Sequence, residues 1–293
     1  MNDKARLVGL VLLLSVGVTL AVVFSVTRVD TPLPSSLAPA FQLLGTPVKA
    51  IDHLVTRVIP VNDLDEREFG DVLRARYDAQ ADTADQDFRY LNDLMTRLAT
   101  AADKPFFYRV YLLDYDVPNA MALPGGVVLV TRGLLDVLQS EAELVAVLAH
   151  ELGHIEHGHC VDAVKFRLLA DKLGARTFGQ IVDFAVRMLV SHSFSKTQED
   201  EADEYAYSAL VNSPYDPRGV GGSFASLLRY VTRSESVEPR GANPIRDYFR
   251  SHPPLEIREA KFRERAEAWW RRNGDQVRHV GEENLRRRTA HVE

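Results

Sequence analysis

Along most of the chain, apolar positions recur with the period of about 3.6 residues that is typical of helices with one buried face. This pattern predicts helices over residues 63–80, 88–101, 133–139, 141–157, 160–190, 196–212, 219–233 and 255–272. Two runs rich in β-branched and aromatic residues, 107–113 (FYRVYLL) and 127–131 (VVLVT), predict strands. Residues 114–126 between them contain prolines and glycines, which predicts an irregular loop. We therefore expect an α+β fold in which helices predominate.

The N-terminal region has a different pattern, because residues 7–26 (LVGLVLLLSVGVTLAVVFSV) carry no charge. At about 1.5 Å per residue, a helix of this length crosses a hydrocarbon core of about 30 Å, so we predict a transmembrane anchor. Lys4 and Arg6 precede it, which keeps the N-terminus cytoplasmic and exports the remainder. A cleaved signal peptide is the alternative, with residues 38–40 (APA) as the cleavage site. The long apolar stretch and the late site favour an uncleaved anchor.

Composition and charge divide the rest of the chain. We expect an anchor in residues 1–30, followed by a linker in the proline- and serine-containing residues 31–60. Residues 61–272 are expected to form a folded domain. The Arg- and Glu-rich residues 273–293 are expected to form a solvated tail. The net charge of -6 gives no sign of a nucleic-acid partner. Cys160 is the single cysteine, so an intramolecular disulfide is excluded.

The candidate chemistry lies on the helix expected over 141–157. Ser140 followed by Glu143 has the form of a capping box and predicts the helix start. His150 and His154 are four residues apart, so both rings project from one face and suit two corners of a tetrahedral zinc site. Glu151 is rotated by about 100° from His150. It can stand beside the metal and accept a proton from a water molecule that zinc activates.

Two alternatives bear on this helix. A histidine pair can be surface decoration, but residues 144–149 (LVAVLA) predict a buried helix, in which unpaired polar groups are costly. His157 falls near the same face as the histidine pair, although Gly158 predicts that the helix ends there. We interpret both His157 and His159 as non-ligands.

The acidic cluster at residues 199–204 (EDEADE) is the place to look for a third ligand. At about 100° per residue, Glu199 and Asp203 share a face with small and apolar residues, while the other acidic residues point toward solvent. The outward residues are Asp200, Glu201 and Glu204. A catalytic zinc takes three protein ligands, so we predict Glu199 as the third ligand. Asp203 would accept a hydrogen bond from a ligand histidine.

HELGH followed by Glu199 and Asp203 resembles the M48 family of zinc metallopeptidases, and the resemblance covers about residues 63–258. Residues 119–126 (NAMALPGG) are similar to a segment that flanks the family's active-site cleft. Residues 194–199 (FSKTQE) are similar to its S-R-x-x-E element, with Lys196 in place of the usual arginine. Residues 251–258 (SHPPLEIR) are similar to its H-P-x-x-x-x-R element.

The resemblance implies a zincin-like (gluzincin) domain with a small β-sheet and one Zn²⁺ per chain. The implied ligands are His150, His154 and Glu199, with Glu151 as the general base and Asp203 as the residue that orients a ligand histidine. His252 and Arg258 would lie near the open side of the metal, where either could stabilise an oxyanion. In some relatives a histidine at this place instead caps the zinc and holds the enzyme latent. An added-strand mode of substrate binding is implied for Asn119, Ala120, Met121 and Ala122.

We therefore expect a zinc metalloendopeptidase that acts on unfolded or misassembled polypeptides at a membrane surface. The anchor would place it on the periplasmic face of a bacterial inner membrane, with room for a regulatory partner. A single anchor differs from the multi-span members of the family. The alternatives are a catalytically silent zinc-binding chaperone or adaptor, against which Glu151 argues, and another zinc hydrolase such as an aminopeptidase, for which no signature is present.

Overall fold

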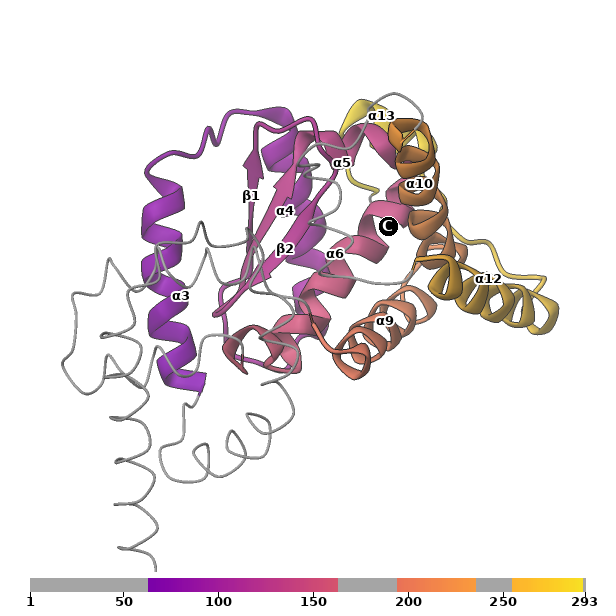
Figure 1. Cartoon of the computed structure of the whole chain (residues 1–293), viewed down its shortest axis with the longest axis horizontal. Helices are drawn as coiled ribbons and strands as arrows, with labels where there is room; N and C mark the ends of the chain where they lie inside the picture. The colour runs from indigo at the N-terminus through magenta and orange to yellow at the C-terminus, as the bar shows by residue number, and fades with distance from the viewer. Residues whose placement is uncertain (1–62, 163–193, 236–254, 292–293) are drawn as a thin grey trace, which may run out of the picture. The chain divides into compact units, whose positions relative to one another are not determined.

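The computed structural model describes residues 63–162, 194–235 and 255–291, which all belong to one compact unit, Ile59–Glu293 (Figure 1). Several predicted features lie outside the described residues: the anchor at 7–26, the linker at 31–60, most of the helix expected over 160–190, and His252. Within the described ranges, no helix is both long enough and apolar enough to cross a membrane.

The expected α+β fold with predominant helices is confirmed for the described residues. The strands are β1 (Arg109–Leu113), β2 (Ala120–Leu123) and β3 (Val127–Thr131). The helices are α3 (Asp63–Asp78), α4 (Gln86–Leu98), the 3₁₀ turn η1 (Ala99–Ala101), α5 (Arg132–Val137), α6 (Glu141–Glu156), α9 (Lys196–Val211), α10 (Arg218–Glu235), α12 (Leu255–Arg272) and α13 (Glu282–Arg287). Most of these bounds lie within a few residues of those that the hydrophobic period predicts.

The described strands form a sheet with the order β1-β3-β2, in which β3 pairs parallel with β1 and antiparallel with β2. The prediction of an irregular loop over 114–126 was wrong, because β2 lies within it. Two consecutive glycines explain how a strand fits in this segment. Gly125 and Gly126 have φ values of 75° and 93°, which close a tight turn between β2 and β3 at no side-chain cost.

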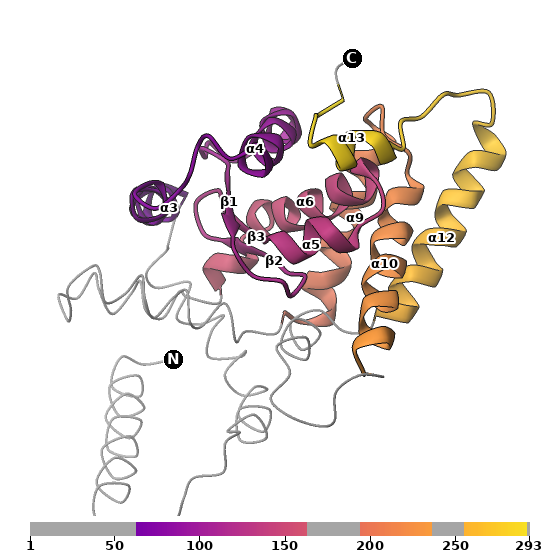
Figure 2. The same cartoon turned by 90° about the horizontal axis from the view of Figure 1, so that it is seen from above.

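Both faces of the sheet are buried, and successive side chains along each strand point to opposite faces. On β3, Val128 and Val130 belong to the large core that includes α4 and α6. Val127 and Leu129 belong to a smaller cluster with Phe69 of α3. Figure 2 shows α3 on one side of the strands and α6 with α9 on the other, while α4 packs against β1 and α6. This arrangement holds α6 firmly in the interior.

The helix α6 is buried along its whole length from Glu141 to Ile155. Ser140 caps it, since its hydroxyl accepts a hydrogen bond from the backbone N–H of Glu143 at 3.2 Å. In the expected capping box, the Glu143 carboxylate would accept a hydrogen bond from the N–H of Ser140. It accepts instead from the N–H of Gln139, one residue earlier. The helix contacts β2, α9 and α10, and it therefore connects the sheet with the C-terminal helices.

The expectation of a solvated tail from residue 273 was wrong for the part that the structure describes. Leu285 and Ala290 are only 4% and 8% exposed. The carbonyls of Val280 and Gly281 accept hydrogen bonds from the first N–H groups of α6, which have no partner within that helix. The prediction rested on the many charged residues and overlooked these apolar positions. Residues 280–290 therefore pack over the start of α6 and are not a solvated tail.

Candidate metal centre

The two histidines of the HELGH motif project from α6 toward a common point. His150 is 8% exposed and His154 is fully buried. Their rings meet edge to face, and their Nε2 atoms lie 3.1 Å apart. The helical period brings them together, because positions four residues apart lie on one face. Each ring therefore presents the same nitrogen to the same small volume.

Glu199 of α9 completes a group of three buried side chains whose ligand atoms all lie within 4.8 Å of one another and could hold a metal ion. Its carboxylate oxygens lie 3.7 Å from Nε2 of His150 and 3.5 Å from Nε2 of His154. In a tetrahedral site with zinc–ligand bonds of about 2.0–2.1 Å, neighbouring ligand atoms are separated by about 3.3 Å. The Nε2–Nε2 separation of 3.1 Å is close to this value. Each histidine also has one oxygen of Glu199 nearby, Oε2 for His150 and Oε1 for His154.

A close approach of two helices positions Glu199 against the histidines. The two helices meet at Gly153, where a Cβ atom would lie 2.9 Å from Cβ of Tyr205 and 3.1 Å from Cα of Ala202. Only a residue without a side chain permits this contact. Ser195 and Gln198 form a capping box that fixes the start of α9. Glu199 consequently falls in the first turn, opposite the HELGH motif.

Asp203 lies one turn further along α9 and is 1% exposed. Its Oδ1 atom lies 3.0 Å from Nδ1 of His150. Burial alone would raise the pKa of Asp203, but hydrogen bonds with His150 and Arg258 hold the pKa below its ordinary value. The carboxylate is therefore ionised and accepts the ring N–H, which leaves Nε2 of His150 with a lone pair for a metal.

Arg258 of α12 contacts the two buried acidic residues of α9. Its Nε and one terminal nitrogen donate to the Asp203 carboxylate at 2.8 and 2.6 Å. The other terminal nitrogen lies 3.0 Å from Glu199. The guanidinium also stacks over the ring of Phe224 at 4.4 Å. The three guanidinium nitrogens thus face these two carboxylates, and the oxyanion role expected for Arg258 stays a prediction.

Glu151 is 1% exposed and is held by the sheet. Its Oε2 atom accepts a hydrogen bond of 2.7 Å from the backbone N–H of Ala122 in β2. Among the described residues, no group donates to its Oε1 atom. One carboxylate oxygen is thus fixed and the other remains able to accept a proton.

The strand β2 lies at an edge of the described sheet, and its residues alternate between the neighbouring strand and the open side. Thr131 of β3 donates its N–H to the carbonyl of Asn119 at 3.0 Å, so Asn119 and Met121 direct their backbone groups toward β3. Ala120 and Ala122 direct theirs outward. On that side the Ala122 N–H is bonded to Glu151, and its carbonyl accepts from the Cys160 thiol at 3.5 Å.

Sequence reasoning missed a partner of His154. Its Nδ1 atom lies 2.9 Å from Nδ1 of His159, whose Nε2 lies 3.0 Å from the carboxylate of Glu201. Burial lowers the pKa of His159, although the contact with Glu201 opposes this shift. Glu201 was expected to face only solvent. The available signal was Gly158, because its left-handed φ of 74° reverses the chain and turns the next side chain back toward the helix.

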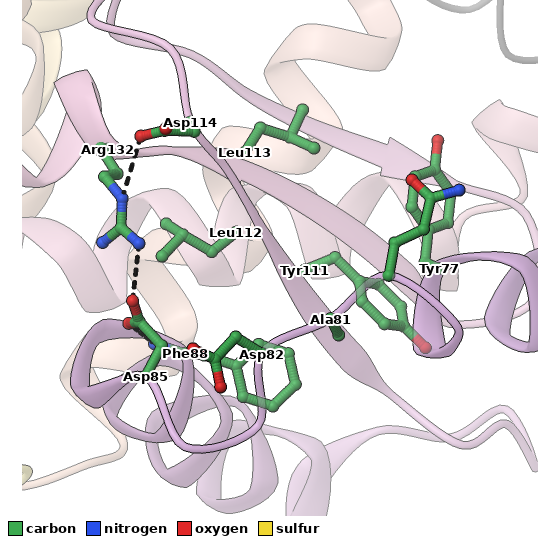
Figure 3. A pocket seen from close by; sticks show the side chains of 11 residues that line it. Tyr77, Ala81, Asp82, Asp85, Phe88, Tyr111, Leu112, Leu113, Asp114 and Arg132 are labelled. Atoms are coloured by element: carbon green, nitrogen blue, oxygen red, sulfur yellow. Dashed lines mark hydrogen bonds and ion pairs between the residues drawn. The ribbon is translucent and has the colours of Figure 1, made fainter.

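A pocket of about 250 Å³ at the β1 edge shares no residue with this centre (Figure 3). Arg132 joins its two sides, since it pairs with Asp85 at 2.6 Å and with Asp114 at 3.2 Å. Asp85 also caps α4 through the N–H of Phe88. The hydrogen bonds with Arg132 and Phe88 overcome the effect of burial and lower the pKa of Asp85. These contacts connect α4 to the end of the sheet.

Comparison with known proteins finds metalloproteases among the proteins to which this chain is similar. The chain is 29% identical to metalloprotease LoiP of Escherichia coli (strain K12) over 223 residues, which are 71% of this chain and 83% of that protein. It is 30% identical to metalloprotease YcaL of the same organism over 176 residues, 55% of this chain and 62% of YcaL. A protease HtpX homolog of Salinibacter ruber is 29% identical over 214 residues, 60% of this chain and 74% of that protein.

The family description "Peptidase family M48" matches residues 85–266 of the 293 in the chain. This range begins at the start of α4 and ends within α12, so it contains the sheet, the HELGH helix and the helix that carries Glu199. The match covers more than half of the sequence and all of the described metal centre. The chain therefore belongs to peptidase family M48.

Proposed function

We propose that this protein is a zinc-dependent metalloendopeptidase. The observation that carries the proposal is the convergence of His150, His154 and Glu199, three buried side chains whose ligand atoms all lie within 4.8 Å of one another. Two imidazoles and one carboxylate are a ligand set of catalytic zinc sites. These three residues would hold one Zn²⁺. When bound there, zinc supplies a Lewis acid that polarises a peptide carbonyl and lowers the pKa of water to about 7.

Glu151 is the general base of this proposal. Oε1 takes a proton from the attacking water while Oε2 remains bonded to the Ala122 N–H, so the carboxylate keeps its orientation during the transfer. The water oxygen adds to the carbonyl carbon, and the carbon–nitrogen bond then breaks. Glu151 delivers the proton to the departing amine. The hydrogen bond to β2 thus links the proton carrier to the strand at which substrate is expected to bind.

The edge of β2 is the proposed substrate site. A peptide added as an extended strand would pair with the outward N–H and carbonyl of Ala120, because those of Ala122 already bond to Glu151 and Cys160. Asn119 and Met121 would hold the strand against β3, and the Ala122 bond aligns the base with it. Backbone pairing of this kind requires an extended substrate, which favours unfolded or misassembled polypeptides.

Asp203 and Arg258 are proposed as positioning residues for His150 and Glu199. His252 retains two proposed roles, an oxyanion stabiliser or a cap that holds the enzyme latent. The change His252→Ala separates them when cleavage is assayed. A stabiliser predicts reduced cleavage by the variant, whereas a latency cap predicts increased cleavage.

We further propose that residues 7–26 tether the domain to a membrane and that it acts on the periplasmic face of a bacterial inner membrane. The support is the uncharged stretch itself, with Lys4 and Arg6 on its cytoplasmic side. Protease added to spheroplasts should digest the domain. Digestion only after the membrane is broken would reject this orientation.

The proposed activity is tested with the full-length chain, solubilised in mild detergent. Bound zinc and the cleavage of casein are measured for the wild type and for Glu151→Gln. We expect about one zinc per chain in both proteins, with cleavage by the wild type alone. Zinc in both with cleavage by neither, and no gain in the His252→Ala variant, would instead indicate a silent zinc-binding protein.

A further inference from the structure

A line of hydrogen-bonding side chains leads from the metal centre to the surface of α9. It runs from His154 through His159 to Glu201, with separations of 2.9 Å and 3.0 Å between the bonding atoms. His159 is 3% exposed, whereas the side chain of Glu201 is about half exposed. The buried middle member therefore touches a proposed ligand on one side and an acidic group on the other.

The backbone explains why His159 reaches His154. The helix α6 ends at Glu156, and Gly158 follows with a φ of 74°. This left-handed residue ends the helix and turns the chain, which places the next side chain beneath the last turn. A new turn starts immediately, since Asp162 donates its N–H to the carbonyl of Gly158 at 3.1 Å. His159 is thereby held between α6 and α9.

The hydrogen-bond roles follow from the proposed metal ligand. If His154 offers a lone pair from Nε2, its proton lies on Nδ1 and is donated to Nδ1 of His159. His159 then carries its own proton on Nε2 and donates it to the Glu201 carboxylate. One assignment of protons satisfies both contacts. The opposite assignment would place a proton between the Nε2 atoms of His150 and His154, where the metal would bind.

We propose that His159, supported by Glu201, is a positioning residue that fixes the tautomer and the ring orientation of His154 for zinc binding. The proposal rests on the zinc site proposed above. Asp203 serves His150 in the corresponding way, with its carboxylate 3.0 Å from Nδ1 of that ring. Each histidine of the HELGH motif consequently has its own acceptor, and the two acceptors belong to different chemical classes.

Phe194 restrains the same ring from another direction. Its ring stacks on that of His154 with centroids 3.9 Å apart and an angle of 21° between the planes. The ring of His159 meets that of His154 edge to face, with centroids 5.1 Å apart. Stacking limits rotation of the His154 ring but does not determine which ring nitrogen carries the proton. The hydrogen bond to His159 supplies that selection.

The test compares zinc affinities of full-length variants by competition with a chelator. His159→Leu removes the acceptor, and we expect zinc to bind about 10–100-fold more weakly. His159→Asn keeps an oxygen near the position of Nδ1, so we expect it to retain most of the affinity. Glu201→Ala should weaken binding less than His159→Leu. The control is Glu204→Ala on the same helix, whose carboxylate pairs with Lys261 and Arg265, and its affinity should be unchanged.

Equal zinc affinity in the wild type and His159→Leu would overturn the proposal. So would an equal loss in His159→Asn and His159→Leu, because it would show that His159 acts through packing alone. Neither result decides whether the protein cleaves casein through Glu151. Failure of the His159 proposal can therefore be told apart from failure of the proposed protease function.

A measurement on the metal-free protein gives an independent readout. Nitrogen chemical shifts of labelled histidine distinguish a proton on Nδ1 from one on Nε2. We expect the Nδ1-protonated tautomer for His154 in the wild type and a mixture of tautomers in His159→Leu. A mixture already present in the wild type would contradict the inference, even in a protein that binds zinc.

Discussion

Gly153 allows the sharpest test of how packing controls the metal centre, because it combines a small change with a large expected effect. A methyl group added at this position would lie 2.9 Å from Cβ of Tyr205 and 3.1 Å from Cα of Ala202. Both contacts involve α9, the helix that carries Glu199. The change Gly153→Ala therefore pushes apart the two elements that supply the proposed ligands.

The magnitude follows from these distances. Nonbonded carbon atoms rest about 3.5–4.0 Å apart, so the helices must separate locally by at least about 0.6 Å. Overpacking costs about 1–3 kcal/mol, and alanine regains about 1 kcal/mol of helix propensity relative to glycine. We expect a net loss of stability of about 0–2 kcal/mol. Ligand distances in metal sites hold within about 0.2 Å, so the displacement should weaken zinc binding at least tenfold.

Urea unfolding of the metal-free protein measures the stability, and competition with a chelator measures the zinc affinity. Gly274→Ala is the control, since Gly274 lies beyond the end of α12, outside α6 and α9, and this change should leave the zinc affinity unchanged. The reasoning would be refuted by a Gly153→Ala protein that keeps the zinc affinity of the wild type. A large loss of stability with unchanged affinity would show that the two helices adjust without moving the ligands.

Three further outcomes are expected. Asp203→Asn should weaken zinc binding about 10–100-fold in the chelator assay, because the amide cannot hold both His150 and a guanidinium as a carboxylate does. Ala122→Pro removes the N–H that orients Glu151 and should lower casein cleavage at least tenfold while bound zinc is retained. Burial raises the pKa of Asp216, but hydrogen bonds, mainly from Arg218, lower it below 3.8. Its stabilising contribution is therefore present above pH 3.8 and lost as the pH falls through the lower folded value. Unfolding midpoints from pH 2 to 7 should fall less steeply at the acid end in Asp216→Asn.

The parts of the fold that depend on local sequence could be predicted. The helix α6 follows from a cap at Ser140 and an apolar stretch, and both are visible in consecutive residues. The inward face of α9 follows from helical angles alone, and the structure buries Glu199 and Asp203 as those angles require. Neither inference needs knowledge of what lies across the interface.

The parts that depend on distant pairing could not be predicted in this way. The strand β2 has few residues and lies between two prolines, so its register is set by β3 and by the turn at Gly125. Arg258 pairs with Asp203 across 55 positions of sequence, which no periodicity records. The contact between His159 and Glu201 depends likewise on the approach of α6 to α9. A charged composition hid the docking of the C-terminal segment, since only a few apolar residues bring it about.

The most direct test of the central claim is X-ray absorption at the zinc edge of the full-length protein loaded with one equivalent of metal. We predict two imidazole nitrogens at about 2.0–2.1 Å and a carboxylate oxygen at about 2.0–2.2 Å, with no sulfur in the coordination shell. The variant Glu199→Ala should lose the carboxylate contribution and retain both imidazoles. A shell that contains the thiolate of Cys160, or only one imidazole, would contradict the account. So would a folded wild-type protein that binds no zinc.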